Sequence, residues 1–287
     1  MPMNDSPDSP PPGSPADLLG PPRTLEAALL RLTQAEHELH ALRSAQQEWL
    51  QAVSHDLRAP LRLVLSFGPL IEEVLAQAAP SPQELQEARA FLQTMDQSAR
   101  RMAGMLDGLL ALSRAARMPM QWQPVALQEL LQQACQAVLA RPQWSASQTV
   151  ARLQWSWPRH SPAVRADANL LRQVLEALLD NAVKFTQPVA QPRVAVEVER
   201  DADGGIALSV SDNGVGFDPA RAGALFGIFQ RMHRESEFPG LGTGLALVRG
   251  VMRRHGGEAS IRAAPGGGCS VCLRWPGGDV RRSDLAP

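Results

Sequence analysis

Two glycine-containing segments have the residue types of a nucleotide pocket. Asp212-Asn-Gly-Val-Gly-Phe217 closes an alternating apolar run, so its aspartate lies at the end of a predicted strand. The carboxylate of Asp212 can accept a hydrogen bond from an exocyclic amine such as that of adenine. Gly214 and Gly216 let the backbone turn sharply and let a flat ring approach closely. The alternative for this segment alone is a simple Asp-Asn-Gly turn.

The second segment, Gly240-Leu-Gly-Thr-Gly-Leu245, opens a helical pattern. Backbone N–H groups at Gly240, Gly242 and Gly244, together with the positive end of the helix, suit a phosphate chain. The G-x-G-x-G spacing is not a Rossmann fingerprint, and no Gly-Lys-Ser/Thr follows to make a Walker A loop. A glycine-rich loop without a ligand is the alternative.

A third group of candidate residues lies on a predicted helix upstream. Asn181 and Lys184 are three positions apart and share a helix face. An amide oxygen for Mg²⁺ and a cation for phosphate oxygens would fit there. Lys184 is the only lysine among 28 basic residues, which weakens the alternative of an ordinary solvated helix end.

His55 is the candidate nucleophile. With Val53 at an a position of a heptad, His55 falls at c, on the exposed face of a predicted helix. An exposed imidazole beside Asp56 is a good nucleophile, since the carboxylate can orient or deprotonate it. Pro60 has no N–H for the carbonyl of Asp56, so we expect a local helix kink. The alternative is an ordinary surface histidine, because the chain has six.

The element that must carry His55 is a helical hairpin. Apolar residues at alternating steps of three and four begin after Thr24, with one polar interruption at Gln46. Pro80-Ser81-Pro82 ends the first helix, and Ser81 with Glu84 forms a capping box for the second. Two such hairpins from two chains would close a four-helix bundle. The alternative is a hairpin docked on its own downstream domain. The two seams are Leu25, Ala28, Leu32, Ala35, Leu39, Leu42, Gln46, Trp49 and Val53, then Leu85, Ala88, Leu92, Met95, Ala99, Met102, Leu106 and Leu109.

The elements that must carry the pocket alternate between helical and strand patterns after a linker at 117–124. Their order predicts an α/β sandwich with helices on one face of a sheet. The predicted helices are Leu127–Leu139, Asp167–Phe185 and Leu241–His255; the predicted strands are Ala151–Trp157, Arg193–Glu199, Ile206–Ser211, Glu258–Ala263 and Cys269–Trp275.

Composition bounds the class of protein. The chain has 287 residues and a net charge of −1, which does not favour nucleic acid or an anionic membrane. No apolar stretch has the length of a transmembrane helix, and the first residues are not a secretion signal, so we expect a cytoplasmic protein. Three cysteines are too few for a disulfide framework. Cys269 and Cys272 lie in a predicted strand without a second Cys/His pair, so we interpret them as small apolar residues, not zinc ligands.

Five segments, in order, resemble the motifs of sensor histidine kinases, over roughly residues 45–276. They are Ser54–Arg62 (phosphoacceptor box), Leu170–Thr186 (asparagine box), Asp212–Phe217 and Gly240–Leu245 (glycine boxes), and Leu225–His233 (phenylalanine box and ATP lid, in the style of phytochrome-associated kinases).

The resemblance implies a division of the chain and an activity. It implies a coiled-coil signalling helix at 24–44, a dimerisation and phosphotransfer hairpin at 45–116 and a Bergerat-type ATP-binding domain at 122–276. Composition predicts a disordered proline-rich tail at 1–23 and a polar tail at 277–287. ATP would phosphorylate His55, and the phosphoryl group would pass to an aspartate of a response regulator. The protein would be a homodimer, with its input from a separate sensor partner, from the N-terminal tail or from nothing.

The same resemblance assigns roles to the candidates. Asp56 would be the base, Asn181 would hold Mg²⁺, Lys184 a phosphate and Asp212 the adenine. The ATP lid would contain Phe226, Phe229 and Arg231.

Two positions depart from the family pattern. Ala177 stands where the family usually has a second asparagine, which predicts reduced kinase activity. Ala59 stands where the family often has Thr or Asn, thought to place a water for dephosphorylation, which predicts weak or absent phosphatase activity. A dimeric scaffold with a degenerate ATP site, favoured only by Ala177, and another ATPase of the same superfold remain as alternatives.

Overall fold

The structure is a computed structural model that describes residues 25–200 and 204–275. The predicted tails at 1–23 and 277–287 lie outside these residues. The chain divides into two compact units, one ending at Gln51 and one beginning at Ala52.

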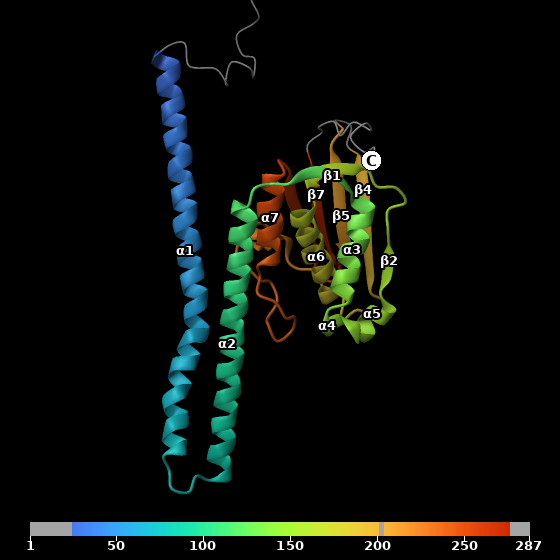
Figure 1. The fold of residues 1–287 in the computed structure, drawn as a ribbon. Helices are drawn as coiled ribbons and strands as arrows, with labels where there is room; N and C mark the ends of the chain where they lie inside the picture. The colour runs from blue at the N-terminus through green and yellow to red at the C-terminus, as the bar shows by residue number, and fades with distance from the viewer. Residues whose placement is uncertain (1–24, 201–203, 276–287) are drawn as a thin grey trace, which may run out of the picture. The chain divides into compact units, whose positions relative to one another are not determined.

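Two long helices form the hairpin. Helix α1 spans Leu25–Leu75 and continues through Pro60 and Pro69, and helix α2 spans Pro82–Arg117 (Figure 1). The predicted capping box is confirmed, because Ser81 Oγ accepts from the Glu84 amide at 3.2 Å and Glu84 Oε2 accepts from the Ser81 amide at 2.8 Å. Phe67 and Phe91 stack across the hairpin, with ring centroids 4.8 Å apart.

The apolar seams of the hairpin are only partly buried. Along α2, Ala88, Ser98 and Met105 are buried, whereas Leu92 and Leu106 are each 52% exposed. One chain therefore covers only part of the stripe that the sequence predicts. Further exposed leucines of the hairpin are Leu61, Leu63, Leu65, Leu70, Leu75, Leu85 and Leu110, and those of the segment before Ala52 are Leu25, Leu29, Leu30, Leu32, Leu39 and Leu50.

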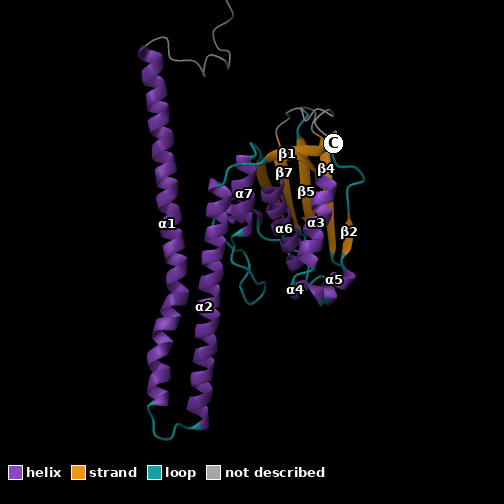
Figure 2. Cartoon of the chain, in the orientation of Figure 1, coloured by secondary structure: helices purple, strands orange, loops and turns teal. Residues whose placement is uncertain are grey.

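The downstream region is an α/β sandwich with a five-stranded mixed sheet. Its strand order is β2 (Gln154–Ser156), β4 (Arg193–Arg200), β5 (Ile206–Asp212), β7 (Cys269–Trp275) and β6 (Glu258–Ala263). Strand β2 pairs parallel with β4, and the other pairs are antiparallel. Helices α3 (Leu127–Leu139), α6 (Ala168–Phe185) and α7 (Gly244–Arg254) lie on one face of this sheet (Figures 1 and 2). The predicted α/β sandwich with helices on one face is thus confirmed.

The core lies between the sheet and these helices. The apolar stripe predicted for α6 is buried throughout, at Leu170, Leu171, Val174, Leu175, Leu178 and Leu179. Burying each such side chain contributes roughly 1.5–3 kcal/mol to folding. The stripe fixes the rotation of α6 and directs its opposite side, with Asn181, away from the core.

Three predicted elements were wrong in part. Residues 117–124 are not all linker, since α2 reaches Arg117 and strand β1 (Trp122–Ala126) pairs with β3 (Ala163–Asp167). The predicted strand Ala151–Trp157 shrinks to β2, because its first residues end helix α5 (Gln148–Arg152). Helix α7 begins at Gly244 instead of Leu241, because Gly242 has a φ of 73°, which a right-handed helix does not allow. The bounds of these elements depend on long-range strand pairing and on local backbone geometry, which the spacing of apolar residues does not predict.

Candidate nucleotide site

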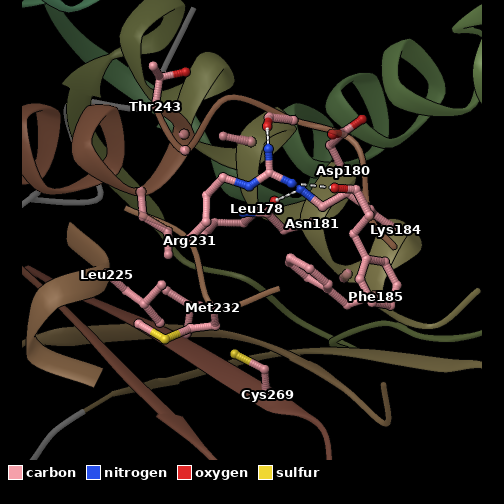
Figure 3. Close-up of a pocket in the computed structure, with 18 of the residues that line it drawn as sticks. Leu178, Asp180, Asn181, Lys184, Phe185, Leu225, Arg231, Met232, Thr243 and Cys269 are labelled. Carbon is pink, nitrogen blue, oxygen red and sulfur yellow. Dashed lines mark hydrogen bonds between the residues drawn. The ribbon is translucent and has the colours of Figure 1, made fainter. Parts of the chain in front are cut away.

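One cavity of about 420 Å³ brings together most of the predicted site residues (Figure 3). It lies between α6, the end of β5 and the segment from Leu225 to Leu245. The predicted residues that line it are Asn181, Lys184, Asp212, Gly216, Arg231, Gly240, Gly242 and Gly244. The remaining candidates for this pocket lie next to it. The amide of Gly214 donates to Asp212, which lines the cavity. Phe226 is buried at the end of a 3₁₀ helix (Pro219–Phe226), and Phe229 packs against the hairpin.

Asp212 ends β5, where its backbone pairs with Val194 on one side and Cys269 on the other. Burial raises the pKa of its carboxyl to about 6, although the amides of Gly214 and Cys269 oppose this shift by donating to the carboxylate. The Gly214 bond, to Oδ1, is 2.8 Å long. Asp212 has no cationic partner in the part of the chain that the structure describes, and a buried carboxylate without one is costly, so this site suits a ligand that brings its own hydrogen-bond donor.

Two glycines of the pocket are required by geometry. Gly216 has a φ of 61°, and a Cβ there would lie 1.9 Å from the carbonyl oxygen of Ala264. Gly242 has a φ of 73°, and a Cβ there would lie 2.7 Å from the carbonyl carbon of Phe229. A side chain at either position would displace the loop. Glycine therefore allows the close backbone packing that the sequence predicts for both glycine segments.

Lys184 and Asn181 face the cavity from α6, where Lys184 Nζ donates to Asn181 Oδ1 at 2.8 Å. Burial lowers the pKa of Lys184 to about 8; the charge of Arg231 adds to this effect, and the charge of Asp180 opposes it. Lys184 Nζ also lies 4.5 Å from the centre of the Phe185 ring. A desolvated ammonium whose direct partners are an amide oxygen and an aromatic ring is a site for an anion.

The donor set fits Mg²⁺ only with help from a ligand. Among the described residues, no group of three or more His, Cys, Asp or Glu side chains could hold a metal ion. Asn181 supplies one amide oxygen toward the cavity. Because Mg²⁺ is commonly held by one or two protein oxygens plus substrate phosphates and water, this sparse set fits a metal that arrives with a nucleotide.

Arg231 extends into the same cavity (Figure 3). Its Nη2 donates to the carbonyl of Phe238 at 2.6 Å, and its Nη1 donates to the carbonyl of Gly240. Burial lowers the pKa of this guanidinium, the charge of Glu235 opposes the shift and that of Arg101 adds to it. Lys184 and Arg231, two of the cations that line the cavity, therefore repel each other, and an anion bound between them would relieve this repulsion.

Ala177, which stands where the family usually has a second asparagine, lies on the wall of the cavity that faces the glycine loop. A Cβ built on Gly244 would be 3.6 Å from Ala177 Cβ and 4.0 Å from Asn181 Nδ2. Helix α7 therefore begins against α6 at Ala177. The missing amide leaves an apolar contact at this point of the cavity.

The structure adds residues that the sequence did not single out. Arg141 Nη1 donates to Asp180 Oδ1 at 2.8 Å and its Nη2 to Glu176 Oε2 at 3.0 Å, while buried Trp144 donates to Asp180 Oδ1 at 2.8 Å. These bonds brace α6 beside Asn181. The partners are more than thirty positions apart in the sequence, so no local spacing announces them.

His233, which the sequence placed only within the lid motif, contacts both the first glycine segment and the end of α6. Its Nε2 lies 2.9 Å from the carbonyl oxygen of Gly216. Its ring packs against Phe185 and Phe238, with centroid distances of 5.6 Å and 5.1 Å. His233 thus joins the lid to the first glycine segment and to the end of α6.

His55 lies on α1 with its side chain 82% exposed. Its Nδ1 is 3.1 Å from Asp56 Oδ1. A carboxylate accepts hydrogen bonds, so the tautomer that suits this contact carries its proton on Nδ1 and its lone pair on Nε2. The exposed imidazole is therefore oriented for nucleophilic chemistry at Nε2.

The lid contacts the hairpin close to this histidine. Phe229 has a φ of 57° and is buried in a cluster with Met105 and Ile228. Val53 and Leu57, which flank His55 on α1, pack against the same cluster. The hairpin therefore contacts its own downstream domain, which was the alternative to a dimer. Other leucines of the hairpin remain exposed in the single chain.

The comparisons with known proteins agree with this architecture. Residues 45–117 match the model of the His Kinase A (phospho-acceptor) domain, and residues 166–279 match that of the histidine kinase-, DNA gyrase B- and HSP90-like ATPases. The circadian input-output histidine kinase CikA of Synechococcus elongatus is 30% identical, over 88% of this chain and 33% of its own length. The sensor-like histidine kinase R01002 of Rhizobium meliloti is also 30% identical, over 88% of this chain and 47% of its own length.

Solved structures share the fold. Histidine kinase ThkA in complex with response regulator protein TrrA has a TM-score of 0.58 and 16% identity, covering 86% of this chain and 66% of that one. Full-length ShkA in complex with AMPPNP has a TM-score of 0.50 and 24% identity, covering 80% of this chain and 45% of that one.

A hairpin that matches the phospho-acceptor domain is thus followed by a domain that matches the histidine kinase-, DNA gyrase B- and HSP90-like ATPases. The chain belongs to the sensor histidine kinase family. It spans a third to a half of the length of the two curated relatives described above. None of the helices in the described residues is long and apolar enough to cross a membrane.

Proposed function

We propose that the chain is an ATP-dependent histidine autokinase that phosphorylates His55 and passes the phosphoryl group to an aspartate of a response-regulator receiver domain. The observation that carries this proposal is the exposed His55 ring, whose Nδ1 lies 3.1 Å from Asp56 Oδ1 and whose Nε2 makes no hydrogen bond within the described part of the chain. We place the boundaries at the residues expected from the sequence, with a signalling helix at 24–44, the hairpin at 45–116 and the ATP-binding domain at 122–276.

The chemistry follows from the geometry. Nε2 of His55 attacks the γ-phosphorus of ATP, an N–P bond forms, and the bond from phosphorus to the bridging oxygen breaks to release ADP. The proton on Nδ1 then passes to Asp56, which leaves a neutral imidazole ring that carries the anionic phosphoryl group on Nε2. Bound Mg²⁺, with Asn181 as its protein ligand, would neutralise charge on the phosphates. Lys184 and Arg231 bind phosphate oxygens, so most of the rate enhancement comes from positioning and charge neutralisation.

The base end of the nucleotide is assigned to the first glycine segment. Asp212 accepts from the exocyclic amine of adenine, and Gly214 holds the carboxylate in place through its amide. Gly216 allows the loop to pass close to the ring. Gly240, Gly242 and Gly244 present their amides to the phosphates, and Phe226, Phe229 and Arg231 belong to the lid.

The partners and the cellular setting are inferred from the same features. The exposed leucines along the hairpin support a homodimer, since a second copy would cover them. A receiver domain as acceptor is supported by the complex of the similar kinase ThkA with TrrA. We place the protein in the cytoplasm, with the possibility of a separate sensor partner as its input.

Incubation with radiolabelled ATP and Mg²⁺ tests the proposal. We expect acid-labile, alkali-stable label on the protein that is lost in His55→Ala and retained in His40→Ala, a matched change at another exposed histidine. No label with ATP still bound would instead support a non-catalytic scaffold. Release of free phosphate without labelled protein would support another ATPase of the same superfold.

A further inference from the structure

The guanidinium of Arg141 binds two carboxylates that lie one helical turn apart on α6. Its Nη1 donates to Asp180 Oδ1 at 2.8 Å, and its Nη2 donates to Glu176 Oε2 at 3.0 Å. All three side chains are partly buried and line the nucleotide cavity. Asp180 directly precedes Asn181, the residue to which we assign Mg²⁺. These ion pairs therefore lie beside the proposed metal ligand.

A short helical turn gives Asp180 a second donor. The indole Nε1 of buried Trp144 donates to the same Oδ1 at 2.8 Å. Arg141 directly precedes helix α4 (Pro142–Ser145), and its carbonyl accepts from the Trp144 amide at 2.9 Å. Because Pro142 has a fixed φ at the first helical position, it favours this turn. Both donors to Asp180 thus come from one short segment that follows α3.

Asp180 also has a competing cation on its own helix. Lys184 is four positions further along α6, the spacing at which an acidic residue and a following lysine can pair on a helix. Both side chains line the cavity (Figure 3). The charge of Asp180 acts on this lysine, since it opposes the lowering of the lysine pKa by burial. Within the described residues, however, no ion pair joins the two, and Asp180 pairs with Arg141 instead.

Loss of Arg141 would change this arrangement. Asp180 would become a partly buried carboxylate without its cation, which is costly, and Lys184 would be the cation next to it on the same helix. An ammonium paired with a carboxylate is less available to a phosphate oxygen, because the two anions compete for one charge. Arg141 can therefore influence the affinity for ATP through Asp180.

We propose that Arg141 is a positioning residue of the nucleotide site, which holds Asp180 together with Trp144 and so leaves Lys184 available to the phosphates of ATP. The inference rests on the proposed ATP site and assigns to it a residue outside the five motif segments. Arg141 acts through the carboxylate and does not itself bind the nucleotide. The segment after α3 thereby determines how strongly the phosphate lysine binds an anion.

The affinity of the full chain for ATP, measured with Mg²⁺ by isothermal titration calorimetry, tests this role. We expect Arg141→Gln to weaken binding by roughly three- to tenfold, the range of a charged hydrogen bond at a partly exposed site. Asp180→Asn alone should change the affinity little, because Arg141 already occupies that carboxylate. In the Arg141→Gln background, the same Asp180→Asn change should restore most of the lost affinity.

Glu176→Gln is the matched control, because it removes the other carboxylate bound by Arg141 and changes the net charge as Asp180→Asn does. Glu176 precedes Lys184 by eight positions, about 12 Å along the helix axis, so it does not compete for the lysine. We therefore expect no recovery of affinity when Glu176→Gln is added to Arg141→Gln. A general attraction between the cavity and an anion would instead give equal recovery with either carboxylate removed.

Trp144→Phe tests the same role without a change of charge. It removes the second donor to Asp180 and keeps an aromatic ring at a buried position. We expect ATP binding to weaken by about two- to threefold, and this loss to vanish when Asp180→Asn is also present. A loss that persists beside Asp180→Asn would mean that the segment only supports the fold of the site. This pair of variants decides the question if Arg141→Gln is unfolded by circular dichroism.

The remaining outcomes separate this role from the nucleotide site itself. If the parent binds ATP and folded Arg141→Gln binds it equally well, the positioning role is wrong while the nucleotide site stands. If Arg141→Gln binds more weakly and Asp180→Asn restores nothing, Arg141 is a direct ligand of the nucleotide and the proposal is also wrong. If neither the parent nor any variant binds ATP, the proposed nucleotide site and the positioning role fail together.

Discussion

Lys184 Nζ donates a hydrogen bond to Asn181 Oδ1 over 2.8 Å, so the two residues that we assign to phosphate and to Mg²⁺ contact each other directly in the cavity. They are one helical turn apart on α6, whose buried stripe fixes their direction. The bond orients the ammonium of Lys184, which lines the cavity. When a nucleotide binds, we expect Lys184 to donate to a phosphate oxygen instead. The amide oxygen of Asn181 then becomes available to Mg²⁺.

Proton uptake should accompany ATP binding at alkaline pH. Lys184 has its pKa lowered to about 8 by burial, so near pH 8.5 much of this amine is neutral in the empty protein. Phosphate oxygens favour the ammonium and raise its pKa, so binding draws a proton from the buffer. Calorimetry in two buffers of different ionisation enthalpy measures this uptake. It should vanish in Lys184→Arg, since guanidinium stays charged; equal uptake in that variant would contradict the assignment.

The same lysine should reduce stability at neutral pH. Its folded pKa of about 8 is below the ordinary value of 10.5, so its contribution to the free energy of unfolding is favourable above that ordinary value and is lost as the pH falls through about 8. We therefore expect Lys184→Met to raise the melting temperature at pH 7 while it weakens ATP binding. Thermal unfolding at pH 7 and pH 10 checks this, and the gain should shrink at the higher pH. A lower melting temperature at pH 7 would mean that the lysine stabilises the empty pocket.

Asp212→Asn should separate binding from stability in a similar way. The side chain keeps an oxygen to accept from the Gly214 amide but loses the buried charge. We expect affinity for ATP to fall about tenfold, as for loss of a hydrogen bond to a charged group. Because burial raises the pKa of Asp212 to about 6, its contribution to stability is lost as the pH rises through that value, so the variant should melt at a higher temperature at pH 7.

Asp218→Asn is the matched control for that experiment. Asp218 is exposed, and its Oδ1 accepts from the Ala220 amide, a role that asparagine retains. Neither affinity nor melting temperature should change appreciably. If Asp212→Asn binds ATP as the parent does, the adenine contact is assigned to the wrong residue.

Ala177→Asn should increase autophosphorylation. The position lines the cavity and lies against the start of α7 at Gly244, so an amide there adds a polar group beside Asn181. We expect an initial rate at subsaturating ATP that is about three- to tenfold higher, as for one added hydrogen bond. Ala177→Leu, nearly isosteric with asparagine but apolar, should not increase the rate. An equal gain in both variants would point to packing instead of a polar contact.

Ala59→Asn should add phosphatase activity toward the phosphorylated regulator. Ala59 lines the hollow that also contains Asp56, four residues after His55. An amide there can position a water, whereas alanine cannot, so we expect the parent to dephosphorylate its regulator slowly or not at all. Decay of the phosphorylated receiver, followed on Phos-tag gels with Ala59→Leu as the apolar control, measures the difference. Fast dephosphorylation by the parent would contradict the prediction.

The sequence determined those features whose physical signal is local. Heptad spacing, a capping box at Ser81 and Glu84, and the apolar stripe of α6 each depend on residues within a few positions of one another. The glycine segments were recognisable because only glycine tolerates the backbone of Gly216 and Gly242. The α/β sandwich, the hairpin and most of the pocket could therefore be predicted from spacing and resemblance.

Only the tertiary structure decided what depends on distant partners. The bonds from Arg141 and Trp144 to Asp180, and the Arg101–Glu235 ion pair, join residues that no periodicity relates. Burial also set the electrostatics: the sequence identified Lys184 and Asp212, but their shifted pKa values arise from desolvation inside the cavity. Sequence spacing thus fixes which chemical groups are available, whereas the folded chain fixes their neighbours, their charge and their competition for one another.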